Sequence, residues 1–97
     1  MRNDPFLMDD SLDEIRRQLD RIDDQIVELL GQRFELISKV SAIKKSQGMG
    51  VYQSNREQQI LDRVLAKGRE KGLNPLLLQA LFLQIFAVSR RDQGKQV

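Results

Sequence analysis

The feature that most constrains this chain is a seam of aliphatic residues with one arginine in it. Alternating steps of three and four residues give the positions Leu12, Ile15, Leu19, Ile22, Ile26, Leu29, Arg33, Leu36, Val40 and Ile43. This spacing predicts a long helix whose apolar stripe packs against other helices. A buried arginine is costly unless it meets a negative group. The partner of Arg33 is therefore either a glutamate of the protein or a bound anion.

We expect this helix to run without interruption from Ser11 to Ser46, preceded by a flexible arm over residues 1–10. Ser11 followed by Glu14 forms a predicted capping box, and the glycines at 48 and 50 end the helix. Such a rod is about 50 Å long. A compact globule of this chain length is only about 33 Å across. A second copy or another domain must therefore cover the seam, and a homodimer is the economical solution.

Two shorter helices are expected to follow. Ser54 and Glu57 form a second predicted capping box, which opens a helix to about Lys67, where Gly68 and Gly72 break it. Its apolar face consists of Ile60, Leu61, Val64 and Leu65.

The third helix is predicted to begin after the cap Asn74, with Pro75 at its first position, and to end at about Asp92. Its inner face consists of Leu78, Phe82, Ile85 and Phe86, and continues by the same spacing to Ser89 and Gln93. With 5% aromatic residues and few β-branched runs, the chain is not expected to form a sheet. The prediction is an all-α, three-helix domain over residues 11–93, followed by a flexible tail over 94–97.

Composition excludes several classes of function. The chain has no His and no Cys, so it lacks the commonest general base, thiol chemistry and the usual zinc ligands. We expect no metal and no cofactor. A net charge of +2 without a Lys/Arg block argues against nucleic-acid binding. The most apolar run, residues 75–88, is too short to span a bilayer, and residues 1–10 do not resemble a signal peptide. We therefore expect a cytoplasmic protein.

Several polar residues lie on the apolar faces. Lys44 follows Arg33 by eleven residues and so falls on nearly the same side of the helix, about 16 Å away. Both side chains could reach one small anion, although the position of Lys44 near the helix end by itself favours extension to solvent and interaction with the helix dipole. Arg16 lies about 25 Å from Arg33 on a different side. Only in an antiparallel dimer would Arg16 of the partner join Arg33.

The shorter helices carry further candidates. Glu57 shares a face with the apolar residues of the second helix, although its spacing alone favours a simple role in the cap with Ser54. The neighbouring Arg56 could have a functional role, but an arginine at such a position is more often simply exposed to solvent. Ser89 and Gln93 continue the inner face of the third helix, or simply mark where that face leaves the core. Together these groups describe a small pocket of cations, one carboxylate and neutral hydrogen-bonding groups, suited to a compact dicarboxylate. The set lacks a nucleophile–base pair.

These residues, in this order, resemble the all-α (type II) chorismate mutases. The resemblance is carried by Ile15-Arg16, Leu19-Asp20-Arg21-Ile22-Asp23, Leu29-Leu30, Arg33, Val40, Lys44, Arg56-Glu57, Leu61, Phe82, Ser89 and Gln93. It implies an intertwined homodimer of three-helix chains with two active sites. It also implies an isomerase that rearranges chorismate to prephenate on the way to phenylalanine and tyrosine. Docking on another enzyme of that pathway stays open.

The resemblance also implies roles for individual residues. Arg33 of one chain and Arg16 of the other would hold the substrate carboxylates. Lys44 would contact a carboxylate and, with Gln93, the ether oxygen of the breaking bond. Glu57, with Arg56 beside it, would accept a hydrogen bond from the ring hydroxyl, and Ser89 would contact a carboxylate.

The sequence departs from the family pattern at two places. Gln53 stands where many members have Asp, near the hydroxyl end of the site, and Arg90 and Arg91 make the end of the third helix unusually basic. Two alternatives stay open. An isochorismate pyruvate-lyase of the same fold would have an apolar residue at the position of Glu57. A non-catalytic helical dimerisation module would lack the cations at Arg33 and Lys44.

Overall fold

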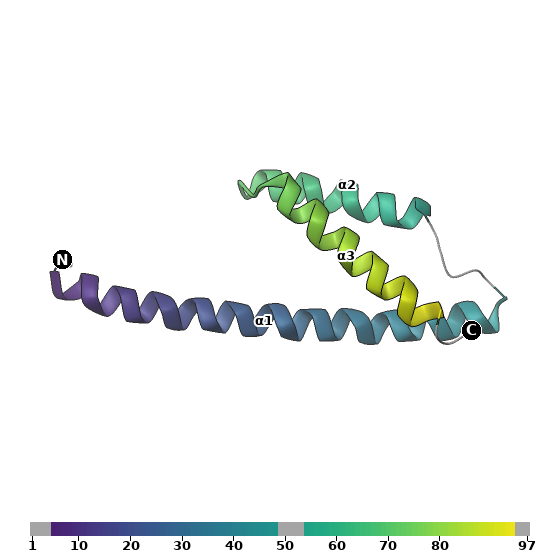
Figure 1. The fold of residues 1–97 in the computed structure, drawn as a ribbon, viewed down its shortest axis with the longest axis horizontal. Helices are drawn as coiled ribbons and strands as arrows, with labels where there is room; N and C mark the ends of the chain where they lie inside the picture. Colours follow the sequence, from purple (N-terminus) through teal and green to yellow (C-terminus); the bar gives the residue numbers. More distant parts are fainter. Residues whose placement is uncertain (1–4, 49–53, 95–97) are drawn as a thin grey trace. The chain divides into compact units, whose positions relative to one another are not determined.

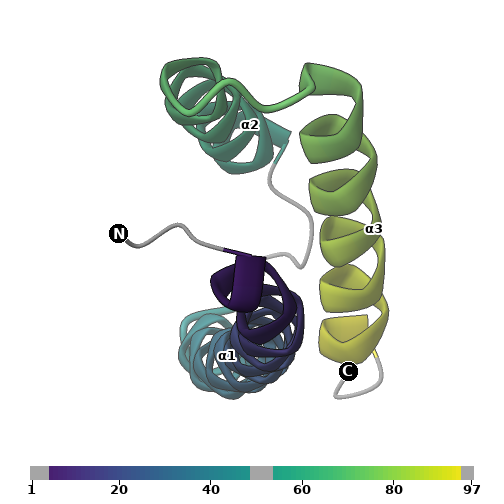
Figure 2. The ribbon, with the colours of Figure 1, turned by 90° about the vertical axis from the view of Figure 1, so that its left-hand side faces the viewer.

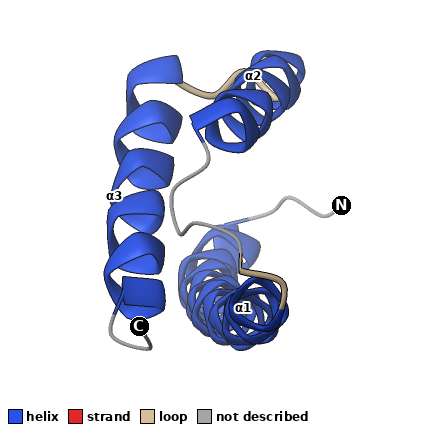
Figure 3. Ribbon diagram, turned by 90° about the vertical axis from the view of Figure 1, so that its right-hand side faces the viewer, coloured by secondary structure: helices blue, strands red, loops and turns tan. Residues whose placement is uncertain are grey.

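The computed structural model describes residues 5–48 and 54–94, with side chains for 11–48 and 55–91. It contains three helices: α1 (Pro5–Ser46), α2 (Ser54–Glu70) and α3 (Pro75–Gly94) (Figure 1). The described part of the chain holds no strand (Figure 3), which confirms the all-α, three-helix prediction. Two units divide the chain, residues 1–35 and residues 36–97, and the boundary between them falls inside α1.

The first helix begins earlier than the sequence predicted. It starts at Pro5 rather than Ser11, so residues 5–10 are its first turns and not an irregular arm. Pro is favoured at the first helical position, and no Gly or further Pro interrupts the chain before Ser11. The predicted capping box is therefore wrong, because Ser11 lies in the helix interior.

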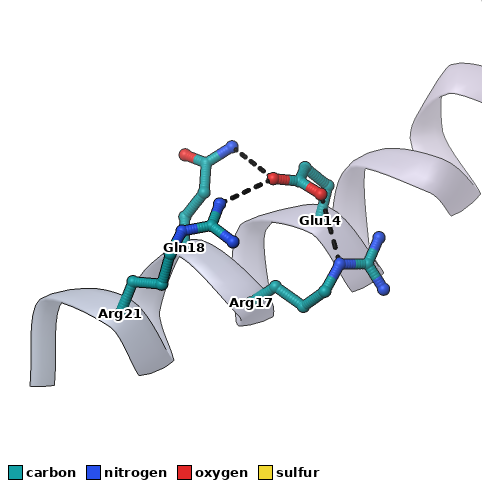
Figure 4. A network of polar contacts seen from close by, with 4 residues as sticks. All are labelled: Glu14, Arg17, Gln18 and Arg21. Atoms are coloured by element: carbon teal, nitrogen blue, oxygen red, sulfur yellow. Dashed lines mark hydrogen bonds and ion pairs between the residues drawn. The ribbon is translucent and has the colours of Figure 1, made fainter. Parts of the chain in front are cut away.

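Glu14 has a different role from the predicted cap. Its carboxylate accepts hydrogen bonds from Gln18 Nε2 (3.2 Å), Arg21 Nη2 (3.0 Å) and Arg17 Nε (3.2 Å), as Figure 4 shows. Hydrogen bonds from Gln18, Arg21 and Arg17, in that order of importance, lower the pKa of Glu14. The network covers one exposed side of α1 and leaves Arg16 outside it.

The end of α1 follows the expected glycine pattern. Gly48 has a φ of 71°, a left-handed conformation that favours glycine. The amide of Gln47 donates to the carbonyl of Ile43 (3.1 Å) and that of Gly48 to the carbonyl of Lys45 (3.3 Å). The second predicted terminator, the glycine at position 50, lies outside the described residues.

The second helix ends at Glu70, later than predicted, because Gly68 does not break it. The terminator is Gly72, whose φ is also 71°. The amide of Leu73 donates to Gly68 O (2.9 Å) and that of Gly72 to Arg69 O (3.1 Å), the two bonds of a Schellman motif. Gly68 has a packing role instead: an added Cβ would lie 2.0 Å from Leu78 Cδ1. The glycine therefore allows α3 to approach α2 closely.

The predicted cap of the third helix is confirmed. Asn74 Oδ1 accepts a hydrogen bond from the amide of Leu76 (2.8 Å), and the carbonyl of Asn74 accepts from the amide of Leu77 (3.1 Å). Pro75 occupies the first helical position, as expected. The helix then extends to Gly94, slightly beyond the predicted end.

The buried core of the second unit lies between α2 and α3, which run back from a short turn in opposite directions (Figures 1 and 2). Its buried apolar side chains are Ile60, Ile85 and Phe86. Phe82 packs on Phe86 with ring centroids 6.1 Å apart and planes inclined by 58°. The remaining predicted inner-face residues, Leu61, Val64, Leu65 and Leu78, are half-buried. Both predicted faces are thus confirmed.

The aliphatic residues of the α1 seam are largely exposed. All nine of its aliphatic side chains are exposed, from 40% for Val40 to 61% for Leu29. An apolar stripe of this length on one helix is typical of a surface that another helix covers. No helix within residues 5–48 and 54–94 is long and apolar enough to cross a membrane.

Candidate functional site

The three predicted cations of the first helix all lie in α1, because the helix continues without a break from Pro5 to Ser46. Arg16 is exposed, whereas Arg33 and Lys44 are half-buried. The Nη1 atom of Arg33 is shielded from solvent.

In the second unit, the structure brings Glu57 of α2 together with Arg90 of α3. Arg90 Nη1 donates to both carboxylate oxygens of Glu57, at 2.5 Å to Oε1 and 2.7 Å to Oε2. Both side chains are half-buried, with 37% of Arg90 and 21% of Glu57 exposed. Charge-assisted hydrogen bonds of this kind are short and strong. The glutamate is therefore held in a defined orientation at the start of α2.

Ser89, which precedes Arg90 in α3, is buried. Its side chain is 6% exposed, and its hydroxyl donates to the carbonyl of Ile85 at 2.7 Å. A hydroxyl has one hydrogen to donate and two lone pairs that accept. Ser89 must therefore rotate away from Ile85 before it can donate to a ligand carboxylate.

The other predicted site residues are placed as follows. Arg56 lies in the first turn of α2 and is exposed, as is Arg91 near the end of α3. Gln53 lies outside the described residues. The backbone of Gln93 belongs to α3, but its side chain lies outside the described part.

The pairing of Arg90 with Glu57 was not predicted from the sequence. The available signal was helical spacing: Phe82, Phe86 and Arg90 follow one another at intervals of four, so Arg90 continues the inner face of α3. In an antiparallel helix pair the end of α3 lies beside the start of α2, where Glu57 stands. Ser89 and Gln93 also follow the apolar residues of α3 by helical spacing, and the prediction assigned the face to these two residues without the arginine.

The chemistry available here is electrostatic. The residues offer guanidinium and ammonium groups, one held carboxylate and a hydroxyl, a set that recognises carboxylates and hydroxyls. Within residues 5–48 and 54–94, no group of three or more His, Cys, Asp or Glu side chains is arranged to hold a metal ion. Side chains of these types bind and orient small anions.

Comparison with known proteins places these residues in a family. The "Chorismate mutase" of Methanocaldococcus jannaschii is 37% identical over 57 residues, covering 59% of this chain and 58% of the relative. The "Bifunctional chorismate mutase/prephenate dehydratase" of Aquifex aeolicus is 31% identical over 61 residues, covering 63% of this chain and 17% of the relative. The "T-protein" of Haemophilus influenzae is 26% identical over 86 residues, covering 89% of this chain and 23% of the relative.

This chain therefore spans only part of the length of each of these relatives, about a fifth of the two longer ones. No solved structure matches it. The description "Chorismate mutase type II" fits residues 15–94, a range that includes most of α1 and all of α2 and α3. The chain belongs to the type II chorismate mutase family.

Proposed function

We propose that this chain is an isomerase that rearranges chorismate to prephenate, and that residues 11–93 carry the activity. The observation that carries the proposal is the family match over residues 15–94. Arg16, Arg33, Lys44 and Glu57 lie within that range, and we propose them as residues of the site because the sequence resemblance implies those roles. Among the similar proteins, the one from Methanocaldococcus jannaschii is itself named a chorismate mutase.

The reaction suits the side chains that are present. The rearrangement is a pericyclic Claisen reaction, so it needs neither proton transfer nor a covalent intermediate. A site accelerates it by holding the enolpyruvyl arm over the ring in a near-attack geometry. Fixed donors also stabilise the negative charge that develops on the ether oxygen as the C–O bond opens. A chain without His or Cys can supply both effects.

Each site residue then has a part. Arg33 and the partner chain's Arg16 bind the two carboxylates, and Ser89 contributes a further carboxylate contact after its hydroxyl rotates. Lys44 and Gln93 approach the ether oxygen, where contacts accelerate the reaction only if they are stronger in the transition state than in the bound substrate. Glu57 accepts a hydrogen bond from the ring hydroxyl of the substrate. Arg56 lies next to Glu57 in the sequence, and Gln53 belongs to the same, hydroxyl-binding end of the site.

We further propose that the active unit is an intertwined homodimer. The exposed seam of α1 supports this, since its nine largely exposed aliphatic side chains need a partner surface. Arg16 and Arg33 are separated by about 25 Å of helix, so one substrate can meet both only if they come from different chains. Each dimer would then hold two shared sites.

The similar bifunctional protein of Aquifex aeolicus joins a chorismate mutase to a prephenate dehydratase in one chain. By analogy, we propose that the present chain works in the cytoplasm on the path to phenylalanine and tyrosine. Docking to an enzyme that consumes prephenate would be consistent with that arrangement.

The direct test is to incubate the purified protein with chorismate and follow the loss of its absorbance together with the appearance of prephenate. Conversion well above the uncatalysed rate is expected. Chorismate loss at the uncatalysed rate would refute the activity, and release of pyruvate instead of prephenate would indicate a lyase.

Sharing of the site between chains has a separate test. Arg16→Ala and Arg33→Ala proteins are each expected to be nearly inactive. After subunit exchange, the mixed dimers contain one site with both arginines and should regain activity. Exchange is verified by light scattering or by a tag on one variant, and a lack of rescue after proven exchange would contradict the shared site.

A further inference from the structure

We infer that Arg90 is a positioning residue: it holds the Glu57 carboxylate in the orientation that receives the ring hydroxyl of the substrate. This inference rests on the proposed function. It assigns a role to an arginine that the family resemblance left without one.

The contact geometry is the first step. A single nitrogen, Arg90 Nη1, lies 2.5 Å from Oε1 and 2.7 Å from Oε2 of Glu57. One donor lying between the two oxygens restrains the distance of the carboxylate and the direction in which it points. A carboxylate has about four acceptor positions, and this donor lies between the two oxygens. The outward lone pairs of Glu57 remain available to a hydroxyl of the ligand.

The second step is that Arg90 is itself held in place. It follows Phe82 and Phe86 at intervals of four on the inner face of α3, and Phe86 is 3% exposed. The Arg90 side chain is 37% exposed, and its guanidinium contacts the Glu57 carboxylate. An orienting group of this kind acts well only when packing restricts its own rotamers.

The third step concerns charge. Chorismate carries two carboxylates, and an isolated Glu57 would repel them. The guanidinium of Arg90 balances that charge locally while leaving Glu57 able to accept a hydrogen bond. Removal of Arg90 should therefore both loosen the glutamate and weaken binding of the dianion.

The test is a double-mutant cycle on the full chain. Arg90→Gln should lower kcat/KM for chorismate about tenfold, the effect expected for one lost charge-assisted hydrogen bond that orients a site group. Arg91→Gln serves as the matched control, since it removes the same charge from the next residue, which is exposed; a change below about twofold is expected. Arg90→Lys keeps the charge but not the planar guanidinium, and should recover part of the loss.

The decisive measurement repeats the Arg90→Gln comparison twice: once in a protein that also carries Glu57→Gln, and once with a substrate analogue. In Glu57→Gln protein, and with a chorismate analogue in which hydrogen replaces the ring hydroxyl, the further effect of Arg90→Gln should shrink to below about twofold. A variant that is partly unfolded loses activity toward both substrates by the same factor, so the ratio between substrates isolates the positioning role. Circular dichroism verifies the helical content of every variant.

The outcomes separate the two proposals. If the wild-type protein does not convert chorismate, the proposed function and this role of Arg90 both fail. If the wild-type protein is active but Arg90→Gln costs as much with the deoxy analogue as with chorismate, or costs nothing, only the role of Arg90 is overturned. If Arg90→Gln lowers kcat/KM for chorismate but has little effect in the Glu57→Gln protein and with the deoxy analogue, the positioning role of Arg90 is supported.

Discussion

Replacement of Gly68 by alanine tests whether the close approach of α2 and α3 determines the stability of this chain. The added Cβ would lie 2.0 Å from Leu78 Cδ1, 3.5 Å from Leu78 Cγ and 3.7 Å from Leu73 Cβ. Carbon atoms in favourable contact are about 3.5–4.0 Å apart, so the first of these distances cannot persist. Either Leu78 must leave its rotamer or the two helices must separate.

The magnitude follows from two opposing effects. Overpacking of this kind costs about 1–3 kcal/mol. Alanine is favoured over glycine inside a helix by about 0.5–1 kcal/mol, which offsets part of that cost. The net expectation is a loss of about 1 kcal/mol in the free energy of unfolding. For a chain of this size, that corresponds to a fall in Tm of about 4–8 °C.

The assay is thermal and urea unfolding followed by circular dichroism at one fixed protein concentration, because association changes apparent stability. Gly31→Ala is the matched control: Gly31 also lies inside a helix, but a Cβ there meets nothing within 4 Å. That variant should be more stable than wild type by about 0.5–1 kcal/mol. Combining Gly68→Ala with Leu78→Ala removes the clashing methyl, so the two changes should be less damaging together than their sum.

The result that would refute this reasoning is a Gly68→Ala protein as stable as Gly31→Ala, or more so. It would mean that Leu78 moves aside at no cost. The approach of the two helices would then not depend on the missing side chain.

Four further changes have defined outcomes. Gly72→Ala forces an L-residue into the left-handed region (φ 71°) and should cost about 1 kcal/mol in the same unfolding assay; an unchanged urea midpoint would contradict this strain. Because hydrogen bonds lower the pKa of Glu14, its stabilisation is present above its usual value of 4.5 and is lost as the pH falls through the lowered pKa. The helix content of wild type should therefore fall more on acidification than that of Glu14→Gln, and parallel titration curves would count against the network. If the seam is the interface of the proposed homodimer, Ile22→Glu places a charge in that interface and should shift the mass measured by light scattering toward the monomer; a dimer of undiminished affinity would show that the seam is not the interface. Lys44→Ala should lower kcat about 100-fold or more if Lys44 acts on the ether oxygen, and a change under twofold would exclude that role.

The features that local sequence could predict are the ones set by a few neighbouring residues. Asn74 before Pro75 predicted the start of α3, and the structure shows the amide of Leu76 bonded to the Asn74 side chain. The spacing of apolar residues predicted the inner faces of α2 and α3, because burial follows the helical period.

Two predictions about helix ends were wrong because a local sequence signal was overridden, in one case by an earlier helix start and in the other by packing between helices. Ser11 and Glu14 have the spacing of a cap, but Pro5 opens the helix first and leaves them inside it. Gly68 has the usual identity of a helix breaker, yet it is retained within α2 because Leu78 occupies the space beside it. No local rule distinguishes a glycine that ends a helix from one that admits a neighbour.

In the candidate site, too, some features could be predicted from local sequence and others depend on tertiary contacts. The positions of Arg33 and Lys44 on α1 followed from periodicity alone. The contact between Glu57 and Arg90 joins residues 33 positions apart. The hydroxyl of Ser89 donates a hydrogen bond to the backbone carbonyl of Ile85. Such choices depend on which partners the folded chain brings within reach, so they appear only in three dimensions.

The exposed seam of α1 also bears on how the chain folds. From Leu12 to Leu29 every aliphatic residue of the seam is about half exposed or more, from 49% for Ile26 to 61% for Leu29. Helical stability in proteins comes mostly from tertiary packing rather than from intrinsic propensity. The hairpin of α2 and α3, by contrast, closes over a short turn and relies on contacts between residues near in sequence, which form quickly. For the proposed homodimer we therefore predict two steps in folding: the hairpin forms at a rate independent of protein concentration, and the long helix becomes fully ordered as two chains associate.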